Sequence, residues 1–243
     1  MTRATRTQRN DMTIKAVTFD LDDTLWPLYD VIMQSHKLSN DWLINKYPQM
    51  EGILFTEQER EMWQRLVKAE PSLGNRLSEL RVKVITTLLV ENGVPEEDAV
   101  INSSKAFDIF LEERHKVTYF DGVLEVLEDL GKEYSLGVLT NGNASIETLG
   151  IDHLFDFYLN AEIVNDSKPG AKMFEQAMVE TSLKPNEICH VGDHPINDVE
   201  GALNVGFKAI WLNALENSWP EGQECHVPEV KNWYELKDVI KSL

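Results

Sequence analysis

The stretch that decides the fold reads Ala16-Val17-Thr18-Phe19-Asp20-Leu21-Asp22-Asp23-Thr24, a short apolar run that ends abruptly in acidic residues. Residues 16–19 have high β propensity, and the polar segment after them predicts a buried strand that leads into a loop. In extended backbone, residues two apart point to the same side, so we expect the carboxylates of Asp20 and Asp22 to lie together. The stretch therefore predicts a strand whose carboxyl end carries two acids.

Residues 118–243 alternate between strand-like and helix-like patterns. We expect strands over 134–139, 156–159, 187–191 and 208–212, and helices over 172–182, 199–205 and 233–243. Strands that are separated by helices form a parallel sheet with helices on both faces. The predicted fold class is therefore α/β, with a parallel sheet at its centre.

Residues 28–117 follow helical periods instead and contain no convincing strand. One predicted helical face carries Leu77, Leu80, Val84, Ile85, Leu88 and Leu89, and Asn92-Gly93 supplies the stop. Thr56 and Glu59 have the N-cap and N3 spacing of a capping box, which predicts a helix over 56–70. We expect about four helices here, as an all-helical insertion into the α/β pattern.

The composition of the chain is acidic. Its 243 residues include 23 Lys and Arg against 41 Asp and Glu, for a formal net charge of −18. Such a chain is a poor candidate for binding nucleic acid or an anionic membrane, and no apolar stretch approaches the roughly 18 residues that span a bilayer. Cys189 and Cys225 lack the spacing of a disulfide framework or a structural zinc site. We therefore expect a cytoplasmic protein without a nucleic-acid or membrane partner.

Residues 1–12 differ from the rest of the chain. They carry Arg3, Arg6 and Arg9 among Thr, Gln and Asn, and they lack the apolar segment of a signal peptide. We expect a disordered basic tail.

Polar and reactive residues follow three of the predicted strands, at Asp20 to Thr24, Thr140 to Gly142 and Gly192 to Asp198. In open parallel sheets, ligands bind beyond the carboxyl ends of the strands, so these segments could converge on one crevice. Lys168-Pro169, at the start of a helix, is expected near the same edge. Each segment alone also has a simpler interpretation: a solvated acidic turn, an Asn-Gly turn, helix capping by Asn197 or Asp198, or a surface lysine.

Taken together, the segments have a clear chemistry. Asp20, Asp22 and Asp193 would form the hard-oxygen site that Mg²⁺ prefers. Thr140 and Asn141 offer a hydroxyl and backbone N–H groups that can hold an anion, and Lys168 is a compact point charge for a phosphate. A zinc site at Cys189, His190 and His194 is disfavoured, because neighbouring residues of a strand point to opposite faces.

These segments resemble the four motifs of the haloacid dehalogenase (HAD) superfamily, in their order and at plausible spacing. The motif residues are Asp20-Leu21-Asp22-Asp23-Thr24, Thr140-Asn141-Gly142, Lys168-Pro169, and Gly192-Asp193 through Asp198. The resemblance implies a Rossmann-like parallel-sheet core over residues 13–27 and 118–243. The helical insertion over residues 28–117 is similar to the type I cap of that superfamily.

The resemblance also implies a mechanism, that of a Mg²⁺-dependent phosphatase. Asp20 would attack phosphorus and form an aspartyl-phosphate. Asp22 would protonate the leaving alcohol and then activate water, and its backbone carbonyl would bind Mg²⁺ beside Asp20 and Asp193. Thr140 and the N–H of Asn141 would hold the phosphoryl group, and Lys168 would spread its charge. Asp198 would act indirectly, by orienting Lys168 or a metal-bound water.

A narrower resemblance concerns the substrate, a small phosphorylated metabolite. The chain is similar to bacterial phosphatases of FMN and phosphorylated ribitylaminouracil over Phe19 to Trp26, Lys68-Ala69-Glu70-Pro71 with Arg81 beyond it, Thr140 to Ala144, and His190 to Asp193. Arg81 is a candidate for binding a substrate anion. Trp42, Phe55 and Trp63 could face a ring-bearing ligand, although aromatic residues in helices more often belong to a core.

Three alternatives remain open at the level of the sequence. A 2-haloacid dehalogenase would share the fold, but dehalogenases of this superfamily lack the second aspartate, and Asp22 is present. A phospho-receiver domain would share the acids, the Thr and the Lys-Pro pair, but receivers are shorter and lack a helical insertion. A non-catalytic scaffold of the same core fold is the third.

Overall fold

Six parallel strands form a single sheet in a computed structural model that describes residues 13–222 and 224–243. The order of the strands is β3-β2-β1-β4-β5-β6, which places β1 in the middle between β2 and β4. The strands are β1 (Ala16–Phe19), β2 (Ser135–Thr140), β3 (Phe157–Asn160), β4 (Ile188–Gly192), β5 (Lys208–Leu212) and β6 (Glu229–Val230). The predicted tail over residues 1–12 lies outside the described residues.

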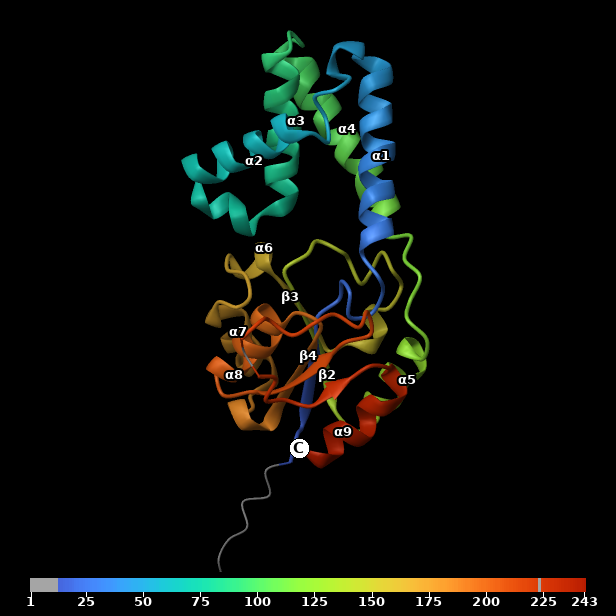
Figure 1. Cartoon of the computed structure of the whole chain (residues 1–243), viewed down its shortest axis with the longest axis vertical. Helices are drawn as coiled ribbons and strands as arrows, with labels where there is room; N and C mark the ends of the chain where they lie inside the picture. Colours follow the sequence, from blue (N-terminus) through green and yellow to red (C-terminus); the bar gives the residue numbers. More distant parts are fainter. Residues whose placement is uncertain (1–12, 223) are drawn as a thin grey trace, which may run out of the picture.

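Helices cover both faces of the sheet, because side chains along each strand alternate between the faces. In β1, Val17 and Phe19 pack into the apolar cluster under α5 (Val123–Leu130) and α9 (Leu236–Ser242). Ala16 belongs to the cluster on the other face, under α7 (Ala171–Thr181) and α8 (Gly201–Asn204). Figure 1 shows these two pairs of helices on opposite sides of the strands. The short α6 (Ala161–Val164) follows β3 directly. The fold is therefore the predicted α/β class.

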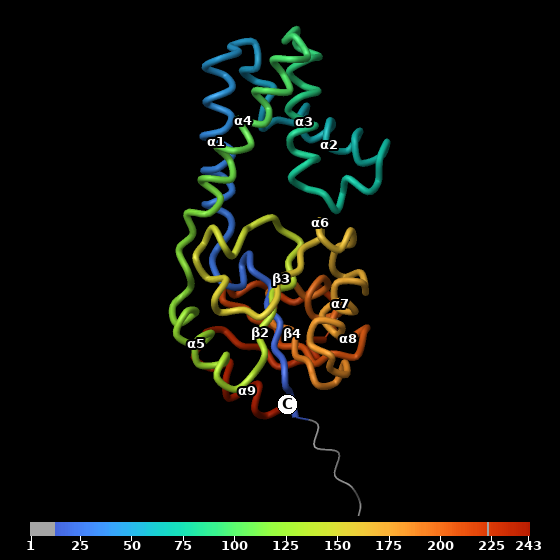
Figure 2. The backbone as a smooth tube through the Cα atoms, turned by 180° about the vertical axis from the view of Figure 1, so that it is seen from behind, coloured from blue at the N-terminus to red at the C-terminus, as the bar shows by residue number. Residues whose placement is uncertain are grey.

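Four α-helices make up the insertion, as predicted: α1 (Tyr29–Lys46), α2 (Glu57–Ala69), α3 (Leu77–Glu91) and α4 (Glu96–Arg114). They surround an apolar cluster of their own, to which α3 contributes Leu80, Val84, Ile85, Leu88 and Leu89. In Figures 1 and 2, α1 and α4 run side by side and lead down to the sheet. The helical unit thus stands over one end of the sheet.

Local details differ from the prediction in three places. Thr56 does not cap α2, because its hydroxyl donates to the Ile53 carbonyl, while Glu59 accepts the N–H of Phe55. The helix expected over 199–205 begins earlier, as a π-helical stretch over Pro195–Glu200 that continues into α8. Its N-cap is His194, whose ring nitrogen accepts from Ile196 and Asn197, so neither of the capping residues considered above is used. The two-residue β6 was not predicted, since two residues carry no period.

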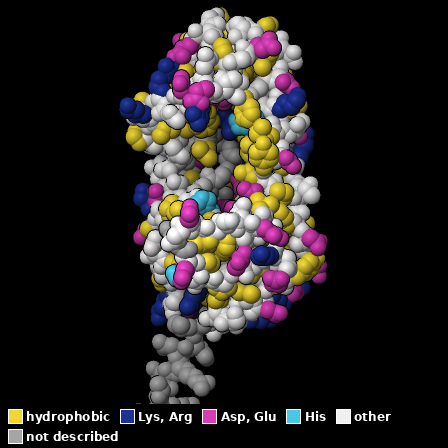
Figure 3. Space-filling view, in the orientation of Figure 1, with side chains coloured by type: hydrophobic (Ala, Val, Ile, Leu, Met, Phe, Trp, Pro, Cys, Tyr) yellow, Lys and Arg dark blue, Asp and Glu magenta, His cyan; other side chains and the backbone are white. Residues whose placement is uncertain are grey.

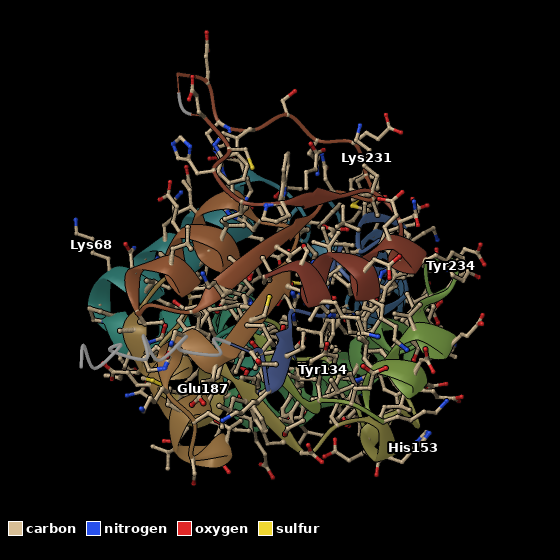
Figure 4. The ribbon with its side chains drawn as sticks, turned by 90° about the horizontal axis from the view of Figure 1, so that it is seen from below. Lys68, Tyr134, His153, Glu187, Lys231 and Tyr234 are labelled. Carbon is tan, nitrogen blue, oxygen red and sulfur yellow. The ribbon has the colours of Figure 1, made fainter. Side chains whose placement is uncertain are left out.

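The carboxyl ends of the strands point toward the helical unit. Figure 4 looks at the opposite end, where the labelled Tyr134 and Glu187 directly precede β2 and β4. In the described ranges, no helix has the length and apolar character that crossing a bilayer requires. The predicted site residues after β1, β2 and β4 lie at the strand ends on the side of the helical unit, and Lys168 lies between α6 and α7. The cavity described next is found at these strand ends.

Candidate active site

A cavity of about 240 Å³ opens at the carboxyl ends of β1, β2 and β4. The four predicted segments all reach it, with the side chains or backbone of Asp20, Asp22, Thr140, Asn141, Lys168, Asp193 and Asp198. Figure 3 shows a hollow on one face of the molecule, between the helical unit and the sheet-bearing part. The four segments therefore meet at one cavity, as expected, because the carboxyl ends of parallel strands lie at the same edge of the sheet.

Lys168 lies in the floor of this cavity and is 3% exposed. Its Nζ donates to Asp20 Oδ1 at 2.8 Å, to Asp198 Oδ1 at 2.5 Å and to the Leu139 carbonyl at 2.6 Å. Burial opposes the charge on the ammonium group, but Asp198 and Asp20 outweigh it and raise the pKa of Lys168. Lys168 is therefore a fixed positive charge beside the Asp20 carboxylate.

His190 contacts the same carboxylate oxygen of Asp198 that binds Lys168. Asp198 Oδ1 lies 3.1 Å from His190 Nε2, Oδ2 accepts the N–H of His194, and His190 Nδ1 lies 2.9 Å from the Thr18 hydroxyl. Burial raises the pKa of Asp198, but Lys168 and His190 reverse this, so that the pKa lies well below its ordinary value. Burial lowers the pKa of His190, so the neutral ring donates from Nε2 and accepts at Nδ1. Lys168, Asp198, His190 and Thr18 thus form one buried chain of contacts.

Asp20, Asp193 and Asp198 form a cluster of carboxylates, with ligand atoms that all lie within 4.8 Å of one another. Burial raises the pKa of Asp20 to about 7, with a further contribution from Asp198, although Lys168 opposes it. Burial and the charges of Asp20 and Asp198 raise the pKa of Asp193 to about 8. Carboxylates crowded in this way need a cation to stay ionised at neutral pH. The hard-oxygen donors fit Mg²⁺, since it prefers carboxylates and water.

Asp193 is fixed by its neighbours through the backbone. Its N–H donates to the Thr24 hydroxyl at 3.1 Å, and its carbonyl accepts from Trp211 Nε1 at 2.6 Å. Thr24 was quoted only as part of the first motif, and nothing in the sequence indicated Trp211. The first bond joins the loops after β1 and β4, and the second joins the loop after β4 to β5.

The Asp22 carboxylate lines the cavity but lies outside the carboxylate cluster. Arg114, the last residue of α4, binds both of its oxygens at 2.5 and 2.6 Å, and Trp26 Nε1 donates at 3.0 Å. The backbone turns between residues 20 and 26, so the strand rule that was expected to align Asp20 with Asp22 does not apply there. Arg114 is buried and was not predicted as a site residue, because a single arginine at a helix end gives no distinctive signal.

Thr140 and Asn141 line the same cavity. The Thr140 hydroxyl accepts the N–H of Gly142 at 3.0 Å, which leaves its own proton free to be donated to a ligand. The Asn141 side chain donates to the backbone carbonyl of Lys168 at 2.9 Å and accepts the backbone N–H of Lys168 at 2.8 Å. This pair of bonds joins the loop after β2 to the loop that carries Lys168.

The predicted cap residues lie away from the catalytic cavity. Arg81, Phe55 and Trp63 line a different cavity, in the helical unit. Trp42 and Trp63 both pack against the apolar cluster of that unit, which is the more ordinary role for an aromatic residue in a helix. Arg81 is therefore not part of the cavity that contains Asp20.

Comparison with known proteins agrees with this geometry. The family model of the haloacid dehalogenase-like hydrolases matches residues 14–206. The chain belongs to this family of hydrolases, which confirms the predicted superfamily and enzyme class.

Two similarities are the most informative. The chain is 30% identical to the 5-amino-6-(5-phospho-D-ribitylamino)uracil phosphatase of Escherichia coli strain K12 over 199 residues, which are 82% of this chain and 83% of that protein. It is 25% identical over 242 residues to the glyceraldehyde 3-phosphate phosphatase of Methanothermobacter thermautotrophicus, over 93% of this chain and all of that protein. These phosphatase names agree with the predicted hydrolysis of a phosphoric monoester.

A solved structure shares the whole fold. A structure described as a 2-haloacid dehalogenase from Pseudomonas syringae pv. Tomato DC3000 has a TM-score of 0.88 and 36% identity, and covers 94% of this chain and 98% of that one. The Rossmann-like sheet and the helical insertion are thus shared over nearly the full length of the chain.

Proposed function

We propose that this protein is a Mg²⁺-dependent phosphatase that hydrolyses a small phosphorylated metabolite through an aspartyl-phosphate on Asp20. The observation that carries the proposal is the contact between the Asp20 carboxylate and the Lys168 ammonium, at 2.8 Å inside a cavity that also contains Thr140, Asn141 and Asp193. A nucleophile, a fixed cation and anion-binding groups in one cavity are the parts that phosphoryl transfer needs.

Each side chain then has a separate task. Asp20 attacks phosphorus. Lys168, the Thr140 hydroxyl and the backbone N–H of Asn141 hold the phosphoryl oxygens. Asp22 gives a proton to the leaving alcohol and later takes one from the attacking water. Asp20 and Asp193, with the backbone carbonyl of Asp22, would hold Mg²⁺, which neutralises charge on the phosphoryl group when it is bound. Asp198 keeps Lys168 in place.

Residues 28–117 act in this proposal as a cap domain over a core of residues 13–27 and 118–243. A cap excludes bulk water from the intermediate and selects the leaving group. FMN and phosphorylated ribitylaminouracil are the first candidates, because of the narrower resemblance and the relative from Escherichia coli. The relative from Methanothermobacter thermautotrophicus adds a triose phosphate to the panel.

The direct test measures phosphate release from these candidates by the purified protein, with and without Mg²⁺. We expect Asp20→Asn to abolish turnover while the fold is retained, since Asn is nearly isosteric. Asp108→Asn is the matched control, because Asp108 is exposed on α4. Activity that persists in Asp20→Asn would refute the nucleophile, and a phosphorylated protein that lasts for hours without turnover would favour a phospho-receiver.

A 2-haloacid dehalogenase is the second candidate, because the Pseudomonas syringae structure with that description is 36% identical. In that reaction the Asp20 carboxylate would displace halide from carbon, and water would hydrolyse the resulting ester. Asp22 favours the phosphatase, since an alkyl phosphate needs a proton donor and a halide does not. Metal-independent release of chloride from chloroacetate, together with no phosphate release from the panel, would establish the second candidate.

A further inference from the structure

Two buried polar side chains lie in the central strands and have no task in the mechanism proposed above. Thr18 of β1 is 0% exposed and His190 of β4 is 1% exposed. The parallel pairing of β1 with β4 places the two residues opposite each other. The other residues of these strands are apolar or glycine: Ala16, Val17, Phe19, Ile188, Cys189, Val191 and Gly192. Thr18 and His190 therefore interrupt two apolar strands at the same level of the sheet.

Both side chains lie on the face of the sheet that α7 covers. Alternation along β1 puts Thr18 on the same face as Ala16, which belongs to the apolar cluster of Phe174. The ring of Phe174 stands edge-on to the ring of His190, with the centroids 5.4 Å apart. A polar group in such surroundings costs free energy unless it is hydrogen-bonded, and a pair of apolar side chains of similar shape would stabilise the layer at least as well. Packing alone therefore does not account for Thr18 and His190.

The ring of His190 has a polar partner at each nitrogen. Nε2 lies 3.1 Å from Oδ1 of Asp198, and Nδ1 lies 2.9 Å from the hydroxyl oxygen of Thr18. An ionised carboxylate only accepts hydrogen bonds, so the proton of the ring is on Nε2. The neutral ring carries no second proton, so Nδ1 accepts and the Thr18 hydroxyl donates to it. The hydroxyl of Thr18 thus selects the tautomer that binds Asp198.

The bond from His190 fixes the carboxylate of Asp198. Oδ1 accepts from both His190 Nε2 and Lys168 Nζ, and Oδ2 accepts the backbone N–H of His194 at 2.9 Å. Without His190, Oδ1 would be bound only by the end of a flexible lysine.

The position of Asp198 matters because Lys168 has no spare proton with which to adjust. Its ammonium group has three N–H donors, and they are directed to Asp20 Oδ1, Asp198 Oδ1 and the Leu139 carbonyl. A shift of Asp198 Oδ1 would therefore move the ammonium group relative to Asp20. Errors of about 1 Å in the placement of a catalytic group can cost about 100-fold in rate.

We propose, on the basis of the phosphatase function above, that His190 is a positioning residue for catalysis and that Thr18 sets its tautomer. Through Nε2–H, His190 holds Asp198 where Lys168 can contact the Asp20 carboxylate and the phosphoryl group. Neither Thr18 nor His190 lines the catalytic cavity, so both act through Asp198 rather than on the substrate.

NMR of the protein with ¹⁵N-labelled histidine tests the tautomer directly. The signals of His190 are those that disappear in His190→Leu. We expect Nε2 to carry the proton and Nδ1 to carry none, and the Nε2 proton to exchange slowly with water because the ring is buried. A proton on Nδ1, alone or together with one on Nε2, would overturn the proposal.

Two replacements of Thr18 separate its hydroxyl from its shape. Thr18→Val keeps the shape but cannot donate to His190, and we expect kcat for phosphate release to fall by about tenfold or more with little change in KM. Thr18→Ser keeps the hydroxyl but loses a buried methyl group, so we expect a lower Tm and the kcat of the wild-type protein. A purely structural role for Thr18 would make kcat follow Tm in both variants.

The double variant Thr18→Val with His190→Leu gives the sharpest contrast. It leaves neither a donor nor an acceptor unpaired between the two strands, so we expect Tm to be retained or raised while kcat falls by about tenfold or more. Cys189→Ala is the control, because Cys189 precedes His190 but packs into the cluster on the other face. There we expect a lower Tm and an unchanged kcat.

The outcomes separate the positioning role from the phosphatase function. If the wild-type protein releases phosphate and kcat is unchanged in Thr18→Val and in the double variant, the positioning role is refuted and the phosphatase remains. If the wild-type protein releases no phosphate from any candidate ester, the phosphatase is refuted, and the positioning role is refuted with it.

Discussion

The ammonium group of Lys168 faces two carboxylates inside a nearly closed environment, so its removal should affect both catalysis and stability. Lys168→Met leaves Asp20 and Asp198 without their shared cation. We expect kcat to fall by about 100-fold or more and the free energy of unfolding to fall by about 3–5 kcal/mol. Steady-state kinetics and urea unfolding measure the two effects. Lys172→Met is the control, because Lys172 is exposed on α7. An unchanged kcat in Lys168→Met would show that another cation stabilises the charge on the phosphoryl group.

The loss of activity in Asp22→Asn is predicted to depend on the leaving group, and to be larger for a leaving group that must be protonated. Asp22→Asn should lower kcat/KM for an alkyl phosphate by about 10²–10⁴-fold. With p-nitrophenyl phosphate the first step needs no proton, so we expect a burst of nitrophenol followed by slow turnover, because the variant also lacks the base that activates water. Rapid-mixing absorbance measurements detect the burst. Equal losses of kcat/KM on both substrates without a burst would show that Asp22 is not the acid–base group. Asp23→Asn is the control, because it keeps the oxygen that accepts the Leu28 N–H.

The turn after β4 depends on the absence of a side chain at Gly192. A Cβ there would lie 2.3 Å from Cγ of Asp198, which is buried and has no room to move. Gly192→Ala should therefore displace Asp198 from Lys168 and His190, lower kcat by at least about tenfold and destabilise the fold by about 1–3 kcal/mol. Gly74→Ala is the control in the helical unit, since its Cβ would meet only Val67 at 3.8 Å. Wild-type kinetics in Gly192→Ala would show that Asp198 does not position Lys168.

The carboxylate cluster links the stability of the whole molecule to pH. Folding raises the pKa of Asp20 to about 7 and of Asp193 to about 8 from an ordinary value of 3.8, chiefly through burial. A carboxyl group of this kind stabilises the fold fully below its unfolded pKa, and the contribution is lost as the pH rises through the folded pKa. Asp198 has the opposite sign, because its pKa is lowered, and its contribution is lost on acidification. The metal-free protein is therefore expected to lose stability from Asp20 and Asp193 between about pH 4 and pH 8.

Mg²⁺ should reverse that loss, because it binds the ionised carboxylates and releases their protons. We expect saturating Mg²⁺ to raise Tm more at about pH 8 than at about pH 6. Calorimetry in buffers of different ionisation enthalpy should also show proton release on binding. In Asp193→Asn the rise in Tm should largely disappear at both pH values. A rise that does not depend on pH would contradict the assignment of these carboxylates to the metal.

The sequence predicted the sheet, the helical insertion and most of the residues that line the cavity, because these follow from local patterns and from one rule about parallel strands. The apolar run over 16–19 and its acidic end were sufficient to place Asp20. The partners of the site residues could not be predicted in the same way. Arg114 reaches Asp22 across 92 positions of the chain, and Trp211 reaches Asp193 through its backbone carbonyl. Contacts of this kind depend on packing, which leaves no periodic signal in the sequence.

The reciprocal bonds between the Asn141 side chain and the backbone of Lys168 imitate the pairing of two strands. They join the loop after β2, which would bind the phosphoryl oxygens, to the loop that carries the Lys168 ammonium group. A shift of one loop would therefore shift the other as well. A replacement at position 141 would have to offer an amide of the same reach, with a donor and an acceptor side by side. Aspartate at position 141 has the same shape as asparagine but lacks the N–H donor. One of its carboxylate oxygens would then repel the backbone carbonyl oxygen of Lys168.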